Sequence, residues 1–134
     1  MMLKCEPAKR TIVTMSQYID GFVLSVATDK IEIYKAVATK AAAIWKEHGA
    51  LGYRECIGDD MDSEHQTPFP KLAGTKAGET VIFSYVVFAS REVRDEANAK
   101  IMADSRIAEM CAGMNGVVDF SRMAQGGFHT LVHQ

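Results

Sequence analysis

The stretch TVIFSYVVF, residues 80–88 of the 134-residue chain, is the strongest strand pattern in the sequence. Residues that favour strands, β-branched and aromatic, make up most of it. Successive strand side chains point to opposite faces, and here both faces are apolar, with Ser84 as the only polar residue between them: Val81, Phe83, Tyr85 and Val87 on one side, Ile82, Val86 and Phe88 on the other. Both faces of this strand therefore need to be covered.

Strands and helices alternate on either side of this strand. Further strand patterns cover residues 18–26, 51–57 and 117–128. Helical patterns follow Thr28, Ser90 and either Asp104 or Ser105, which are residue types that cap helix N-termini. The resulting order is β-α-β-β-α-β, with an extra helical piece before the last strand. Right-handed crossovers convert that order into a ferredoxin-like α+β fold, a four-stranded antiparallel sheet with both long helices on one face.

The helix between Thr28 and His48 has the clearest apolar stripe, at a period of 3.6 residues, and Gly49 is positioned to end it. Tyr34 and Trp45 fall on this stripe. Packing in the core explains both residues, and the alternative is that they form the wall of a ligand cavity. Both are candidate ligand-binding residues.

The chain divides into a short leader and one domain. Residues 1–14 have mixed charge and no sustained period, so we expect a poorly ordered leader or an artefact of the choice of start, because Met15 is a second plausible start. Residues 15–134 form the single ferredoxin-like domain. Within it, residues 58–78 are polar and lack a period, which is typical of a lid, an interface arm or a binding loop.

Composition excludes several classes of protein. The 15 Lys and Arg against 17 Asp and Glu give a net charge of −2, which favours neither a nucleic-acid partner nor a membrane surface. Three widely spaced cysteines predict neither a disulfide framework nor a zinc site, and they favour the cytoplasm. Gly126-Gly127 lacks the strand-then-helix context of a phosphate loop, and no metal or other cofactor is predicted.

The two apolar faces of the 80–88 strand predict that the chain pairs with itself. Two helices cover only one face of the predicted sheet. Leaving several large side chains exposed on the other face costs several kcal/mol at about 25 cal/mol per Å² of apolar surface. A second copy, packed sheet against sheet with two-fold symmetry, provides the simplest cover. We therefore expect a homodimer.

Several segments of the sequence are similar to a known family. The runs YIDGFVLSV, KEHGALGYRECIGDD, IMADSRI and FSRMAQGGF resemble the YbaA-like family of small bacterial proteins. The resemblance covers residues 15–128. It implies a ferredoxin-like fold of the dimeric α/β-barrel superfamily, and it implies no activity, because that superfamily includes cofactor-free monooxygenases, dehydratases, haem-degrading enzymes and ligand-binding proteins.

Two carboxylates, Asp20 and Glu55, occur within predicted strands whose faces are otherwise apolar. An ionised group there is costly unless it is paired, and Arg122 in the last predicted strand is an available partner. The functional interpretation is a polar pocket floor with a carboxylate as base and Arg122 as anion binder. The structural alternative, an interface ion pair or an edge-strand charge, is the favoured one.

Asp59 and Asp60 belong to an acidic run that follows the 51–57 strand. The run fails the EF-hand template, since His65 stands where glycine is required. A solvated acidic loop is the favoured interpretation. However, loops that follow strands often carry binding sites, so Asp59 and Asp60 are candidate ligand-binding residues.

The sequence thus predicts a small cytoplasmic protein that binds a small apolar or anionic molecule between its helices and its sheet. The alternative is a cofactor-independent enzyme, monooxygenase-like or dehydratase/isomerase-like, that uses the strand carboxylates with Arg122. A purely structural interaction module is a third class, supported only by the apolar second face.

Overall fold

A computed structural model describes residues 16–134. Its four strands, β1 (Tyr18–Ala27), β2 (Gly52–Ile57), β3 (Glu79–Phe88) and β4 (Ala124–His129), form one sheet in the order β2-β3-β1-β4. Every neighbouring pair is antiparallel. This is the predicted four-stranded antiparallel sheet of an α+β fold. The leader predicted at residues 1–14 lies outside the described residues.

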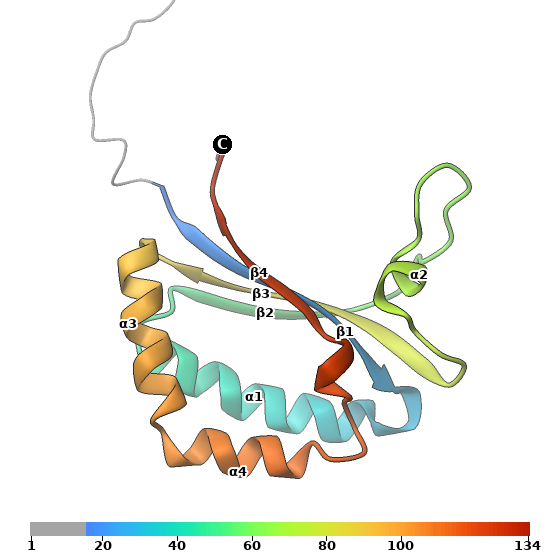
Figure 1. The fold of residues 1–134 in the computed structure, drawn as a ribbon, viewed down its shortest axis with the longest axis horizontal. Coiled ribbons are helices and arrows are strands. Elements are labelled where there is room, and N and C mark those ends of the chain that lie inside the picture. The colour runs from blue at the N-terminus through green and yellow to red at the C-terminus, as the bar shows by residue number, and fades with distance from the viewer. Residues whose placement is uncertain (1–15) are drawn as a thin grey trace, which may run out of the picture.

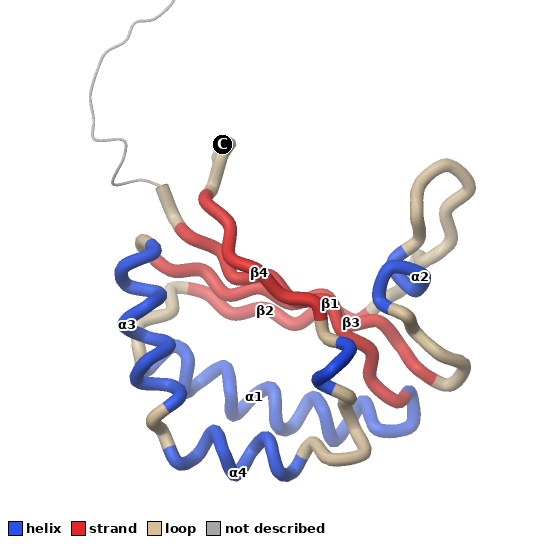
Figure 2. Tube along the Cα trace, viewed as in Figure 1, coloured by secondary structure: helices blue, strands red, loops and turns tan. Residues whose placement is uncertain are grey.

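The helices form two unequal layers. α1 (Ile31–Glu47), α3 (Arg91–Met102) and α4 (Ser105–Gly113) cover one face of the sheet, and the short α2 (Phe69–Ala73) lies on the opposite side (Figure 1). The strands between them form a single twisted layer (Figure 2). Among residues 16–134, no helix combines the length and the apolar character that a membrane crossing requires.

Most helix boundaries follow the predicted caps. The Ser90 side chain accepts a hydrogen bond from the Val93 backbone N–H at 3.2 Å and begins α3, and Asp104 caps α4 in the same way through the Arg106 N–H. Gly49 follows α1 with φ 123°, a conformation that favours glycine.

Two predicted boundaries are wrong. Thr28 does not cap α1, because its hydroxyl bonds the Thr80 hydroxyl at 2.8 Å and a 3₁₀ turn, η3 (Thr28–Lys30), comes first. The predicted last strand from Val117 is shorter, because Asp119 caps a second 3₁₀ turn, η4 (Phe120–Arg122). The chain thus reaches β4 only at Ala124, and η4 places a turn beside the helices.

The core lies between the sheet and the three long helices. Two clusters of buried side chains fill it, one around Leu24, Val26 and Ile82 and one around Tyr18, Val86 and Phe88. β1 and β3, the central strands, contribute to both clusters, as the apolar pattern of residues 80–88 predicts. A cavity lies between the two clusters, next to Phe22, which packs against both of them.

The opposite face of the sheet is only partly covered. The segment that carries α2 covers one end of it, where Val81 is 4% exposed and the Ser25 hydroxyl bonds the Thr75 hydroxyl at 2.8 Å. Further along, Phe83 is 44% exposed although the Phe69 ring of α2 packs beside it, and Phe128 is 59% exposed. Residues 58–78 therefore supply part of the predicted cover from within the chain.

The glycine pair in β4 has a steric explanation. A Cβ at Gly127 would lie 2.7 Å from a ring carbon of Tyr18, which is closer than such atoms can approach. Gly126 has no comparable restriction, since a Cβ there would meet only Phe128, at 3.8 Å. Gly127 lets β4 pair with β1 directly over the Tyr18 ring.

Candidate functional site

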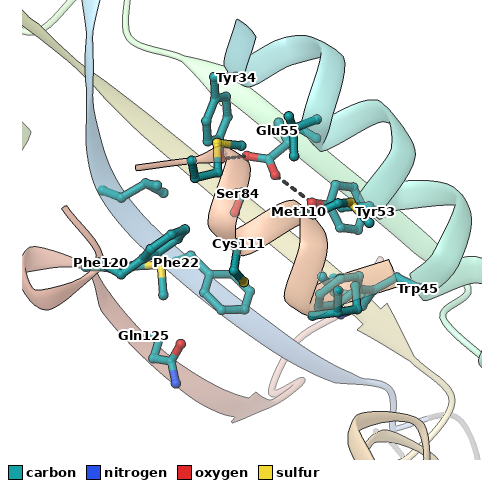
Figure 3. A pocket seen from close by; sticks show the side chains of 18 residues that line it. Phe22, Tyr34, Trp45, Tyr53, Glu55, Ser84, Met110, Cys111, Phe120 and Gln125 are labelled. Atoms are coloured by element: carbon teal, nitrogen blue, oxygen red, sulfur yellow. Dashed lines mark hydrogen bonds between the residues drawn. The ribbon is translucent and has the colours of Figure 1, made fainter. Parts of the chain in front are cut away.

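A cavity of about 250 Å³ lies between the sheet and the helices α1 and α4 (Figure 3). All four strands contribute to its lining, and so does η4. Most lining side chains are apolar, and the larger ones are Phe22, Trp45, Met110, Met114, Phe120 and Met123. The few polar groups are therefore the ones that would orient a bound molecule.

The principal polar group is Glu55, in the middle of β2. Its two carboxylate oxygens each accept one hydrogen bond of 2.7 Å, from the hydroxyls of Tyr34 and Tyr53. Tyr34 comes from the first turns of α1, and Tyr53 lies two residues before Glu55 on the same side of β2. The half-buried carboxylate is thus held by neutral phenols.

The two phenols are fixed in their protonated form. Burial is the main cause, followed by the charge of Glu55 and its hydrogen bonds, and together these raise the pKa of both Tyr34 and Tyr53 far above the ordinary value near 10. Both hydroxyl hydrogens are already directed at Glu55. What this end of the cavity offers to a ligand is therefore the remaining lone pairs of oxygen, which accept hydrogen bonds.

Glu55 can also be reached from outside the sheet. A second, wider cavity of about 600 Å³ lies between α1 and the edge strand β2, and Tyr34, Tyr53 and Glu55 line both cavities. The outer one also includes the charged residues Glu32 and Lys35. The carboxylate with its two phenols therefore forms a wall between an apolar interior and a partly polar groove.

Trp45 and Tyr34 line the inner cavity, as the ligand-wall interpretation of the α1 stripe requires. The Trp45 ring lies edge-on to Tyr53, with 6.0 Å between ring centroids. Tyr34 is also part of a core cluster, so it serves packing and the cavity at once. The structure thus brings together three of the candidate residues, Glu55, Tyr34 and Trp45.

Asp20 lies apart from this cavity. It lies in β1, is 7% exposed, and accepts a hydrogen bond of 3.1 Å from the Arg94 guanidinium of α3. Arg94 also donates to the Tyr18 hydroxyl at 3.1 Å and stacks over the Tyr18 ring. Burial raises the pKa of the Asp20 carboxyl, and the Arg94 charge only partly opposes that effect. Asp20 does not line the cavity beside Glu55.

Arg122 does not meet Asp20, so the expected Asp20–Arg122 pair is wrong. The chain leaves the predicted strand at η4, and this turn directs Arg122 to Glu79 at the start of β3, with a 2.6 Å ion pair. Arg122 also bonds Asp119 and the backbone carbonyl of Gly74. Its hydrogen bonds hold the pKa of the Glu79 carboxyl below the ordinary value. Its position indicates that it fastens η4 to β3 and to the α2 segment.

Asp59 and Asp60 are exposed in the loop after β2 and line neither cavity. The β2 strand ends before them, and the chain turns away from the helices toward the α2 side of the sheet (Figure 1). Their position matches the solvated acidic loop that the sequence favours.

Sequence reasoning missed three polar cavity residues, Tyr53, Ser84 and Gln125. Tyr53 had a usable signal, because a tyrosine two residues before a strand glutamate shares its face and can reach it. Ser84, the single polar residue between the apolar faces of residues 80–88, was a second signal. Gln125 had none, because no apolar pattern around it in the sequence marks it as facing a cavity.

One group of side chains has the composition of a metal site. Carboxylate and imidazole atoms of Glu47, His48 and Asp104 lie within 4.8 Å of one another. The Arg106 guanidinium already bonds both carboxylates, Glu47 at 2.6 Å and Asp104 at 2.6 Å, and it lowers the pKa of the Asp104 carboxyl. These contacts describe an ion-pair cluster that ties the end of α1 to α4.

Comparison with known proteins assigns the family. A family described as "Protein of unknown function (DUF1428)" matches residues 17–120. The chain belongs to this family. It is 39% identical over 118 residues to "Uncharacterized protein YbaA" of Escherichia coli strain K12, covering 88% of this chain and 99% of that protein, and equally so to YbaA of Shigella flexneri. The YbaA-like resemblance inferred from the motifs is thereby confirmed.

Solved structures extend the likeness to the fold alone. A NIPSNAP family protein with unknown function from Agrobacterium tumefaciens superposes with a TM-score of 0.56 at 17% identity, covering 87% of this chain and 89% of that one. SnoaB, a cofactor-independent oxygenase from Streptomyces nogalater, gives a TM-score of 0.56 at 13% identity, covering 88% and 95%. A dimeric ferredoxin-like protein from an uncultured marine organism gives 0.52 at 12% identity, covering 89% and 97%.

Proposed function

We propose that the cavity beside Glu55 binds a small, mainly apolar molecule that carries a hydroxyl group or another hydrogen-bond donor. The observation that carries the proposal is the pair of 2.7 Å hydrogen bonds from Tyr34 and Tyr53, which direct both phenol hydrogens to Glu55. The Glu55 carboxylate and the two phenol oxygens then present acceptors only, beside an apolar volume of about 250 Å³. This is slightly below the roughly 300–1,000 Å³ of pockets for drug-sized ligands, which favours a smaller molecule.

The same geometry argues against the anionic ligand that the sequence also allowed. An anion would meet the negative charge of Glu55 at close range, in a partly buried site where the repulsion is weakly screened. Arg122, the expected anion binder, is occupied by Glu79 and Asp119. A neutral donor such as a phenol or an alcohol instead forms a strong hydrogen bond with a carboxylate.

The single tryptophan of the chain makes a direct test possible, because Trp45 lines the cavity. Titration with para-propylphenol, followed by tryptophan emission, is expected to change the emission saturably. Propylbenzene, which lacks the hydroxyl, is expected to bind at least tenfold more weakly, since a hydrogen bond to a charged group contributes about 1.5–3 kcal/mol.

Two variants locate the binding. Glu55→Gln keeps the shape but removes the charge, and we expect it to weaken para-propylphenol binding about tenfold. Asp59→Asn removes a nearby charge outside the cavity and is expected to leave the affinity unchanged. Equal binding of phenol and hydrocarbon, or an equal effect of the two variants, contradicts the proposal.

A second candidate function is catalysis at the same position. Glu55 would lie at the hydroxyl of the bound molecule, where a carboxylate can take a proton as general base. The fold likeness to SnoaB, a cofactor-independent oxygenase, supports a reaction of this class. An enzyme is expected to lose turnover in Glu55→Gln while keeping its melting temperature. Retained turnover removes this candidate.

We also propose that the chain forms a homodimer through the face of the sheet that α2 leaves open. Phe83 and Phe128, 44% and 59% exposed, lie on this face beside the half-buried Tyr85 and Val87. Aromatic side chains of this size bury roughly 150–250 Å² each when covered. Light scattering is expected to report a dimer for the native protein and a monomer for Phe83→Lys. A folded native monomer at micromolar concentration contradicts the proposal.

The location we propose is the cytosol. Cys56 and Cys111, the cysteines of the described part of the chain, are both free thiols, which fits a reducing compartment.

A further inference from the structure

Three polar residues of the cavity, Glu55, Ser84 and Gln125, lie in one row that the sheet register defines. Glu55 of β2 stands opposite Ser84 of β3, and Ser84 stands opposite Phe22 of β1. Phe22 in turn stands opposite Gln125 of β4. All four side chains line the same cavity. The row therefore crosses the whole sheet from one edge strand to the other on the side of the helices.

The dimensions of this row follow from strand spacing. Neighbouring strands lie about 4.8 Å apart, so the three steps from Glu55 to Gln125 separate their backbones by roughly 14 Å. Figure 3 shows the Glu55 carboxylate at one end of the cavity and the Gln125 amide at the other, with the Phe22 ring between them. The Phe22 ring thus lies between the polar pair Glu55 and Ser84 on one side and Gln125 on the other.

The two ends offer different chemistry. Glu55 offers acceptor positions only. The Gln125 amide offers two N–H donors and a carbonyl acceptor, so it can bind a hydroxyl, a carbonyl or an amide. Gln125 is exposed, whereas Ser84 is buried, which places the amide at the mouth of the cavity and leaves water within reach of it. A polar group bound there need not lose all of its hydration.

We infer that the ligand is two-ended. A donor group binds Glu55, an apolar body lies over Phe22, and a second polar group at the opposite end of the molecule binds Gln125. Gln125 is then a specificity-determining residue that selects molecules whose two polar groups span the sheet. This inference rests on the proposed function, and it adds the second polar group and the residue that recognises it.

The test compares two probes that differ only at the far end. One is para-propylphenol, and the other is its analogue with an alcohol at the end of the propyl chain. On the native protein, followed by Trp45 emission, the alcohol is expected to bind at least as tightly as para-propylphenol, although it is the more polar molecule. Gln125→Leu has a similar volume but no amide. It is expected to lower the preference for the alcohol by about 3- to 10-fold, the effect of one neutral hydrogen bond.

Two further variants keep the result specific. Gln125→Asn retains a shorter amide and is expected to keep part of the preference. Phe120→Leu alters an apolar wall at the mouth and is expected to weaken both probes alike. If both probes bind but Gln125→Leu affects them equally or not at all, the two-ended ligand is wrong while the proposed function stands. If neither probe binds the native protein, the proposed function itself fails, and this inference with it.

Discussion

Two carboxylates face the helices from the same sheet, and they are held in opposite ways. Asp20 lies in the central strand β1 and accepts from the Arg94 guanidinium, in a fully packed part of the core. Glu55 lies in the edge strand β2 and accepts from two neutral phenols, with a cavity on either side. Asp20 is paired with a cationic side chain of the protein itself, whereas Glu55 is hydrogen-bonded by neutral phenols and lies beside empty volume. This difference supports the proposal that Asp20 is a structural residue and that Glu55 is the centre of the binding site.

Of the pair Asp20 and Arg94, Arg94 contributes more to the free energy of unfolding. Burial raises the pKa of Asp20 despite the presence of Arg94, so the ionised carboxylate costs the fold more than the guanidinium returns. Arg94 has other favourable contacts with the Tyr18 ring, the Tyr18 hydroxyl and Asp95. Removing Arg94 therefore leaves a buried carboxylate without compensation, whereas neutralising Asp20 leaves an arginine that still has partners.

The largest expected effect follows from this asymmetry. Arg94→Met is expected to lower the free energy of unfolding by about 3–5 kcal/mol at neutral pH, measured by urea denaturation. Arg91→Met is the control, since Arg91 lies one turn earlier on α3 and its ion-pair partner among residues 16–134 is the exposed Asp95. The control is expected to cost less than about 1 kcal/mol. Adding Asp20→Asn to Arg94→Met is expected to restore part of the loss, and equal losses in the two single variants contradict the assignment.

The second largest effect is expected at Gly127 in β4. Gly127→Ala is expected to lower the free energy of unfolding by about 1–3 kcal/mol, because its Cβ overlaps the buried Tyr18 ring that Arg94 holds in place. Gly126→Ala, one residue earlier on the other face of β4, is the matched control with a contact no closer than 3.8 Å. Thermal melting of both variants is the measurement. A Gly126→Ala variant that melts lower than Gly127→Ala would mean that the Tyr18 ring is not packed as described.

In the Glu55 region the expected losses of stability are smaller. Tyr53→Phe and Tyr34→Phe each remove one hydrogen bond while the other phenol still holds Glu55, so each is expected to cost about 0.5–1.5 kcal/mol in urea denaturation. Tyr85→Phe, on the opposite face of the sheet, serves as the control with an expected change within about 0.5 kcal/mol. A loss of the size expected for Arg94→Met would mean that Glu55, like Asp20, has a structural role.

The smallest expected effect is a pH dependence. The folded protein binds the Asp20 proton more tightly than the unfolded chain does, because the pKa of Asp20 is raised in the fold and is about 3.9 in the unfolded chain. The contribution of Asp20 to the free energy of unfolding therefore increases as the pH falls through the raised pKa of the folded state. This contribution is fully present below about pH 3.9, the pKa in the unfolded chain. Urea denaturation between pH 7 and pH 4 is expected to show the native protein gaining stability relative to Asp20→Asn.

Because stability is measured relative to Asp20→Asn, the contributions of the other carboxylates cancel in this comparison. Glu47, Glu79, Asp104 and Asp119 have lowered pKa values, mainly through hydrogen bonds to Arg106, Arg122 and Ser121, so they lose stability in acid in both proteins. If the native protein instead loses stability relative to Asp20→Asn in acid, Arg94 outweighs burial at Asp20.

The order of the elements could be predicted because its signals are local. The apolar faces of residues 80–88 and the Ser90 cap depend on neighbours a few residues away, and both are found as predicted. The partner of Asp20 could not be predicted in this way. Arg94 is 74 residues distant and reaches Asp20 only because α3 packs against the sheet.

In the candidate site, too, single residues could be predicted from local sequence signals, whereas their arrangement around a cavity could not. Glu55 attracted attention as a carboxylate in an apolar strand, and Tyr34 and Trp45 as members of the α1 stripe. What placed them around one cavity was the packing of α1 and α4 on the sheet, which depends on tertiary structure. Arg122 was assigned to a strand because its apolar neighbours continue the pattern, and the 3₁₀ turn capped by Asp119 directs it elsewhere.

The most direct test compares Asp20→Asn with Glu55→Gln in a single binding measurement. Each variant neutralises one strand carboxylate, and the affinity for para-propylphenol is followed by the emission of Trp45. If Glu55 is the centre of the site and Asp20 is structural, Glu55→Gln weakens binding about tenfold and Asp20→Asn leaves it unchanged. Loss of binding in Asp20→Asn, with Glu55→Gln binding as tightly as the native protein, would contradict the assignment of the two carboxylates.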